Sequence, residues 1–265
     1  MKNKKLIRWC PLVFTAAFAL FCTLLRALQL KRELLVSGSV GAGSSTALTV
    51  LTLLFLALLP LLLRPLKKRG DCAQVFTGEL TPCVLQLLAA AGLIVGNLLL
   101  WLSDSDPVSA LYVQTPEVTR VLSTMLPPLG IVSGLCIGAF ALACRAGKRP
   151  TPLLYMAASV YLIVRLILCF QSWNTDPSIW NYCFQLLAAI SCMLATFQLA
   201  GFCFGRGRRR VSLYWCLCAV VFCSINVADT VLRSGTDDIV VNFALLLSLA
   251  VSAVQLLFAR KKRPS

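Results

Sequence analysis

The chain has 265 residues, of which 58% are apolar and only 13% are charged, and its mean hydropathy is +0.83. Soluble domains are about a quarter charged, and this chain lacks the polar surface needed to coat a water-soluble globule of its size. The composition therefore excludes a soluble enzyme, a disordered tail and a disulfide-stapled secreted module, and it indicates an integral membrane protein.

Apolar segments of about 20 residues predict eight transmembrane helices. In chain order they run over residues 9–29, 46–63, 83–102, 121–143, 152–171, 181–203, 212–232 and 239–258. The apolar character continues around every segment, whereas the strands of a membrane barrel alternate and are half as long. Because the joins are short, we expect one all-α transmembrane bundle over residues 1–265, with no soluble domain. The even rhythm of the joins suggests four helical hairpins.

The net charge is +15, and the basic and acidic residues are concentrated in alternate joins between the spans. Most of the 25 Lys and Arg residues lie in residues 2–8, 64–69, 145–149, 206–210 and 260–263, and the intervening joins hold most of the acidic residues. By the positive-inside rule, the basic joins and both termini are cytoplasmic, in the cell (inner) membrane. We expect these joins to contact the anionic headgroups of the lipid bilayer, and we expect no binding of nucleic acid.

Glycines recur every four residues on the third and fourth predicted spans. They are Gly92 and Gly96 on the third, and Gly130, Gly134 and Gly138 on the fourth. Such stripes let two helix backbones approach closely, and dispersion contacts then hold the helices together in lipid. We therefore predict that these two helices pack against each other through the two stripes.

Two consecutive prolines, Pro127 and Pro128, lie in the outer third of the fourth predicted span. Each proline removes a backbone N–H and crowds the preceding turn. The pair predicts either a kink or a late start of this helix, and the sequence leaves both alternatives open.

Polar side chains inside the spans are the main indication of function. An ionisable group at the bilayer centre costs roughly 2.5–3.5 kcal/mol on insertion scales, so it needs a partner or a role. The candidate ligand or ion-pair cluster consists of Arg26, Asn97, Arg165, Asn226 and Asp229. These residues lie in the first, third, fifth and seventh spans, each in the outer third, so we expect them to share one depth.

The candidate cluster has two interpretations. If Arg165 pairs with Asp229, Arg26 is left to meet an anion or a carbonyl, and the pocket suits a small anionic or zwitterionic ligand. Alternatively, the cluster is structural: a plain ion pair, with arginine side chains that reach the outer headgroups. Both interpretations stay open.

Catalytic and metal-binding patterns are missing from the sequence. The chain has no histidine, which removes the commonest metal ligand and the usual general base. Most of the 13 cysteines lie within apolar runs, where thiols behave as small hydrophobic groups. We therefore expect no catalytic residue, no metal and no cofactor.

Three functions follow as hypotheses. The first is a small-solute binding or transport protein whose site is the polar layer in the outer leaflet. The second is a non-catalytic membrane scaffold or partner subunit of a larger complex. The third, an enzyme acting on a lipid-linked substrate, is opposed by the missing histidine, so we expect no enzyme.

The general layout and the stretch Tyr161-Leu-Ile-Val-Arg-Leu-Ile-Leu-Cys-Phe170 resemble polytopic membrane proteins of Gram-positive gut bacteria. The resemblance implies a multi-pass protein of a bacterial plasma membrane. It covers one span and carries no known activity, so no functional residue follows from it.

Overall fold

The computed structural model describes residues 2–37, 46–66, 72–76, 79–102, 117–148, 150–174, 179–205, 207–233 and 236–258, and these ranges hold helices and turns. The helices of the described ranges are α1 (Lys2–Ser37), α2 (Thr46–Leu63), α3 (Cys72–Val75), α4 (Leu80–Leu102), α5 (Glu117–Arg145), α6 (Leu153–Asn174), α7 (Ile179–Cys203), α8 (Arg209–Arg233) and α9 (Thr236–Phe258). All of them except α3 are long and apolar enough to cross a membrane. The all-helical, eight-span architecture predicted from the sequence is therefore confirmed.

Helix α1 is longer than predicted at both ends, α5 begins at Glu117 rather than at residue 121, and one short helix was not predicted. Helix α1 continues to Ser37, beyond the predicted limit at residue 29, because residues 30–37 contain no proline or glycine that would stop it. The short helix α3 lies in the join after α2, where the apolar pattern is too brief to predict a helix.

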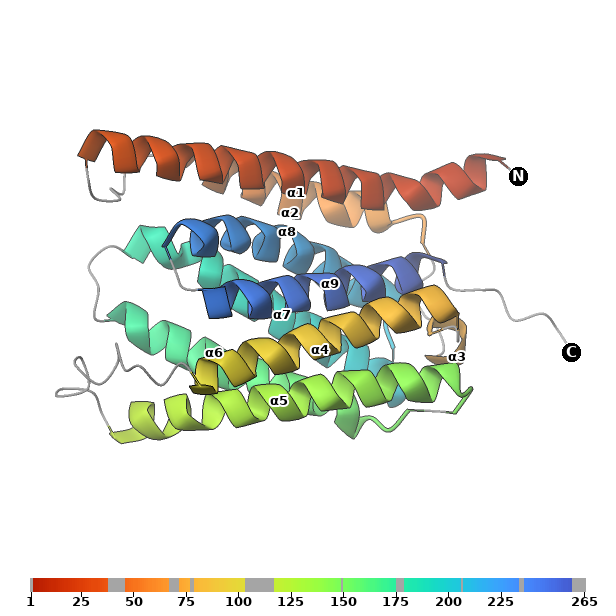
Figure 1. Cartoon of the computed structure of the whole chain (residues 1–265). Coiled ribbons are helices and arrows are strands. Elements are labelled where there is room, and N and C mark those ends of the chain that lie inside the picture. Colours follow the sequence, from red (N-terminus) through yellow and green to blue (C-terminus); the bar gives the residue numbers. More distant parts are fainter. Residues whose placement is uncertain are drawn as a thin grey trace, which may run out of the picture.

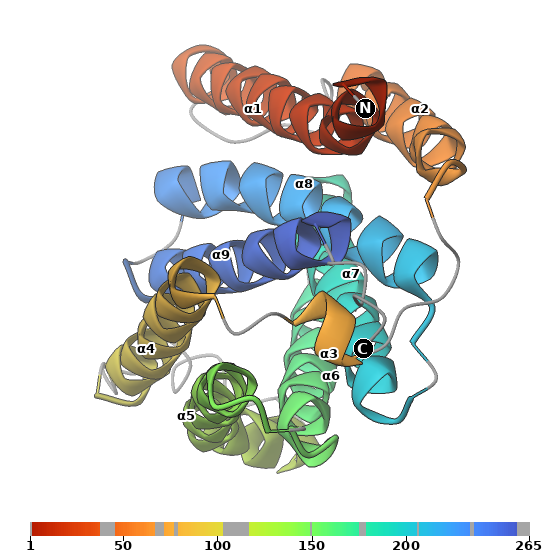
Figure 2. The ribbon, with the colours of Figure 1, turned by 90° about the vertical axis from the view of Figure 1, so that its right-hand side faces the viewer.

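Six helices form a closed ring. Helices α4, α5, α6, α7, α8 and α9 pack against one another in chain order, and α9 packs back against α4. The end-on view of Figure 2 shows this ring, with α1 and α2 outside it next to α8. Helices α8 and α9 are the most buried of the eight spans, and α1 and α2 are the least buried.

The predicted hairpins form unequally. The pairs α4–α5, α6–α7 and α8–α9 each pack along their length, whereas α1 packs far more extensively against α8 than against α2. Figure 1 shows that α1 begins and α9 ends at the same end of the bundle. We call this end the basic end, since Arg64, Arg145 and Arg209 lie there, and the opposite end the distal end.

Two arginines of the basic end fasten helix ends together. Arg209, at the start of α8, donates from Nε to the carbonyl oxygen of Leu256 at 2.6 Å and from Nη2 to that of Leu257 at 3.1 Å. Arg210 donates to the carbonyl oxygens of Arg64 and Leu66, just after α2. Carbonyls at a helix C-terminus have no partner within the helix, so these guanidinium groups satisfy them.

The glycine stripes serve two different contacts. A Cβ atom at Gly134 of α5 would lie 2.6 Å from Ile94 Cγ1 of α4, and one at Gly138 would lie 3.6 Å from Ala90 Cβ. The stripe of α5 therefore faces α4. On α4, however, a Cβ atom at Gly96 would lie 2.6 Å from Val241 Cγ2 of α9, and one at Gly92 would lie 3.2 Å from Ala244 Cβ.

The prediction that the two stripes face each other is therefore wrong for α4. Helix α4 lies between α5 and α9 in the ring, and each of these neighbours approaches it closely over a different stripe. Of the two alternatives left open at Pro127 and Pro128, the late start is excluded, because α5 begins well before them, at Glu117, and runs through both prolines to Arg145.

Candidate functional site

The most buried charged pair of the described residues joins α1 to α8. Arg26 is 1% exposed, and its Nε lies 2.7 Å from Oδ1 of Asp229. The guanidinium group also lies over the ring of Phe184 on α7, 5.7 Å from its centroid, at cation–π distance. Arg26 therefore does not extend to the surface, and the carboxylate that neutralises it is Asp229.

This pairing corrects the sequence interpretation that joined Arg165 to Asp229. The sequence predicts a similar depth for Arg26 and Arg165, so the sequence pattern alone does not distinguish between them as partners of Asp229. The structure resolves the choice because α1 packs on α8, while α6 lies elsewhere in the ring. Arg26 and Asp229 therefore form a structural contact between α1 and α8.

Arg165 has its own partners on α9. Its Nη2 donates to Oδ1 of Asn242 at 2.9 Å, and it lies 3.5 Å from Oδ1 of Asp238. The side chain of Arg165 is 14% exposed and that of Asp238 is 41% exposed, so this pair reaches from the bundle interior toward the distal surface. A contact at 3.5 Å to a half-exposed carboxylate is a weak ion pair.

Asn97 and Tyr161 extend this polar group into the bundle. The hydroxyl of Tyr161 on α6 donates to Oδ1 of Asn97 on α4 at 3.2 Å, and Nδ2 of Asn97 donates to the carbonyl oxygen of Leu93 at 2.8 Å. Both side chains are almost fully buried. Tyr161 and Arg165 are four residues apart on one face of α6, so the contacts of Tyr161 lie next to those of Arg165.

We define the distal cluster as Asn97, Tyr161, Arg165, Asp238 and Asn242, which come from α4, α6 and α9. Within it, two donors have no hydrogen-bond partner in the described part of the chain: Nη1 of Arg165 and Nδ2 of Asn242. A buried donor left without an acceptor costs roughly 1–3 kcal/mol, so native proteins rarely tolerate it without a reason. Two such donors beside each other are suited to hold an acceptor-rich group such as a carboxylate.

The five predicted candidates thus separate into two places. Asn97 and Arg165 belong to the distal cluster, whereas Arg26 and Asp229 join α1 to α8. Asn226 is buried on α8, three residues before Asp229. The single polar layer expected from the shared depth is therefore divided between two faces of the bundle.

The sequence interpretation missed three members of the distal cluster. Asp238 and Asn242 are four residues apart at the start of α9, a spacing that places an acid and an amide on one helix face. That spacing could have predicted a polar site at the start of α9. Nothing in the sequence singled out Tyr161, since a lone tyrosine in an apolar span is most often a core residue.

Cysteine and metal chemistry find little support in the described ranges. None of the 13 cysteines, all of which lie in these ranges, forms a disulfide, and the sulfur atoms of Cys192 on α7 and Cys223 on α8 lie 3.2 Å apart in the core. Among the described residues, no group of three or more His, Cys, Asp or Glu side chains is placed to hold a metal ion.

The chain matches no protein-family model, and no curated protein or solved structure is significantly similar to it.

Proposed function

We propose that the protein binds a small carboxylate-bearing solute at the distal cluster. The supporting observation is the adjacent pair of unpartnered buried donors, Arg165 Nη1 and Asn242 Nδ2. A carboxylate offers two acceptor oxygens, and an arginine N–H bond to an anion is roughly twice as strong as a neutral hydrogen bond. Asp238 is the neighbouring acceptor for a hydroxyl or ammonium group on the same solute.

The comparison of Arg165 with Arg26 favours a ligand-binding role for Arg165 over a purely structural one. Arg26 is already neutralised at close range by Asp229, whereas Arg165 has only a weak ion pair with a half-exposed acid. An arginine held in a bundle with part of its donor capacity unused is a typical component of an anion-binding site.

The proposal includes the orientation of the protein. The basic end faces the cytoplasm, and its arginines and lysines contact anionic headgroups at about 1 kcal/mol per residue. The distal cluster then opens to the outside of the cell membrane, so the solute reaches Arg165 from the external medium.

Calorimetric titration of the purified protein in detergent tests this proposal. Acetate, glycolate, glycine and phosphate are titrated in turn, and we expect at least one carboxylate to bind. Arg165→Gln keeps a donor amide but removes the charge, so the Kd should rise about tenfold or more, since 1.4 kcal/mol corresponds to a factor of ten.

Ser191→Ala is the matched control for this titration. Ser191 is buried on α7, outside the distal cluster, and donates to the carbonyl oxygen of Ala188 in its own helix. The control should keep the wild-type Kd. If none of the three carboxylates binds the wild type, or if Arg165→Gln binds as well as Ser191→Ala, the proposal is wrong.

A scaffold or partner-subunit role is the alternative function. It is favoured by the position of α1 and α2 outside the ring, where leucines of α2 such as Leu53 and Leu54 are exposed. Stoichiometric co-purification of one protein after gentle solubilisation, together with a flat titration, would favour this alternative.

A further inference from the structure

A second polar centre lies toward the basic end of the same three helices, α4, α6 and α9. Nε2 of Gln86 donates to the hydroxyl of Tyr155 at 3.3 Å and to that of Ser248 at 2.9 Å. Gln86 is 4% exposed, yet its Oε1 has no hydrogen-bond partner within the described residues. A buried amide oxygen without a donor calls for a ligand or a water that carries an N–H or O–H group.

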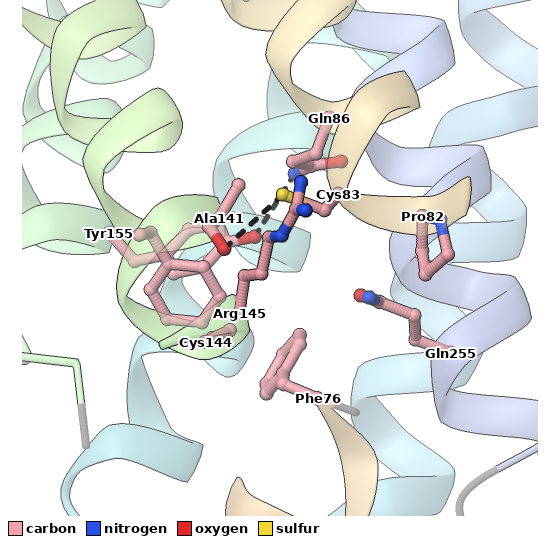
Figure 3. Close-up of a pocket in the computed structure, with 10 residues that line it drawn as sticks. Phe76, Pro82, Cys83, Gln86, Ala141, Cys144, Arg145, Tyr155 and Gln255 are labelled. Carbon is pink, nitrogen blue, oxygen red and sulfur yellow. Dashed lines mark hydrogen bonds between the residues drawn. The ribbon is translucent and has the colours of Figure 1, made fainter. Parts of the chain in front are cut away.

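Gln86 also lines a small cavity, shown in Figure 3. The cavity measures about 10 Å³, which is room for roughly one water molecule. Its polar lining includes Arg145, Tyr155 and Gln255, and its apolar lining includes Phe76 and Phe140. Arg145 ends α5 and is exposed, so it places a positive charge at the basic-end side of the cavity.

The cavity and the distal cluster lie along one line through the ring. Gln86 and Asn97 are on the same face of α4, three helical turns or about 16 Å apart. Ser159 lies on α6 between Tyr155 and Tyr161 in the sequence, and its Oγ is 3.2 Å from Thr196 Oγ1 on α7. One pair of buried hydroxyl groups therefore lies between the levels of the two centres.

The two centres offer the same chemistry. Each combines a guanidinium group with a neighbouring acceptor oxygen: Arg165 with Asp238 at the distal end, and Arg145 with Gln86 Oε1 at the basic end. A guanidinium group binds a carboxylate through paired hydrogen bonds. The acceptor oxygen accepts a hydrogen bond from a hydroxyl or ammonium group on the carbon next to that carboxylate. The shared ligand class is thus a small carboxylate with a hydroxyl or ammonium group next to it.

We propose that the cavity between Gln86 and Arg145 is a second binding station for the solute of the distal cluster, and that the protein carries small hydroxy- or amino-carboxylates through the ring. This inference rests on the proposed function. At its present size the cavity excludes such a solute, so α4 and α5, which supply Gln86 and Arg145, must separate when the station is occupied.

Uptake into sealed proteoliposomes tests the proposal. Radiolabelled glycolate and glycine are the probes, and acetate, which lacks the second donor, is the comparison compound. We expect wild-type protein to take up glycolate or glycine at least about tenfold faster than acetate, since one charge-assisted hydrogen bond is worth about that factor. The glycolate and glycine arms distinguish a hydroxyl from an ammonium donor.

Arg145→Gln and Lys148→Gln form a matched pair. Both residues are exposed cations at the same end of α5, and only Arg145 lines the cavity. We expect Arg145→Gln to lower uptake about tenfold and Lys148→Gln to leave it unchanged. Gln86→Leu should lower uptake as strongly, and its elution as a single peak in detergent checks its folding.

The binding titration of the distal cluster separates the two claims. In detergent, Arg145→Gln should still bind the solute at the distal cluster, because Arg165 is intact, and its titration should lack only the contribution of the second station. Wild-type binding without uptake overturns the second station and leaves the proposed function standing. Equal uptake by Arg145→Gln and Lys148→Gln also overturns it, and a failure of the wild type to bind any probe removes both claims.

Discussion

The side chain of Asn97 fills the space that a Cβ atom at Gly130 would need. Such an atom would lie 2.1 Å from Oδ1 of Asn97 and 2.5 Å from Nδ2. Asn97 has little freedom to retreat, since it is fully buried and bonded to Leu93 and Tyr161. The absence of a side chain at Gly130 on α5 therefore makes room for Asn97 and its hydrogen bond to Tyr161, which joins α4 to α6.

Gly130→Ala should therefore displace Asn97 and destabilise the protein by about 1–3 kcal/mol, as other overpacked interiors do. Gly138→Ala, on the same stripe, adds a methyl group at an ordinary contact distance of 3.6 Å and should cost less than about 0.5 kcal/mol. Thermal unfolding midpoints in detergent compare the two variants. Equal midpoints would contradict the close fit at Gly130.

The ion pair between Arg26 and Asp229 gives a second prediction. Arg26→Leu or Asp229→Leu alone leaves one buried charge without its counter-charge, and we expect each to cost about 3–5 kcal/mol. The double variant buries neither charge and should cost clearly less than the sum of the singles. Strictly additive losses of unfolding free energy would show that the two residues are not coupled.

The capping arginine of α8 gives a third prediction. Arg209→Gln removes charged hydrogen bonds to the carbonyls of Leu256 and Leu257, and we expect a loss of about 2 kcal/mol. Arg208→Gln is the control, because Arg208 is the preceding residue and is exposed. The unfolding midpoint of the control should match the wild type, and a matching midpoint for Arg209→Gln would rule out a stabilising role of its cap.

Reporter insertion tests the orientation. Fluorescent-protein insertions at Gly147 and Gly207, at the basic end, should fluoresce, because the positive-inside rule places that end in the cytoplasm. Alkaline phosphatase insertions at Ser105 and Thr175, which lie outside the described residues, should be active. Inverted results at two or more of these positions would reverse the orientation and place the distal cluster inside the cell.

The sequence predicts the membrane-spanning helices well and the lateral position of their residues poorly. Apolar runs of span length define all eight membrane helices, because a bilayer imposes a minimum length on each. The contact between Arg26 and Asp229 shows that these two residues lie at one level of the bundle. The residues that a side chain contacts depend on which helices are neighbours in the bundle. The apolar pattern does not determine which helices are neighbours.

Arg26 illustrates the limit. At equal depth, either arginine is a reasonable partner for Asp229, and the choice follows from the packing of α1 on α8. The same limit explains why Gly92 and Gly96 were assigned to the wrong neighbour. Small residues predict a close approach, and they do not identify the helix that approaches.

The contact between α1 and α8 has a consequence for how the chain is made. Helix α1 precedes α8 in the chain by six spans, so Arg26 is synthesised long before the acid that neutralises it. During that interval the charged group of Arg26 must be solvated by the headgroup region or by water, because it has no counter-charge. Helix α1 therefore cannot make its main contacts with the bundle until α8 has been synthesised.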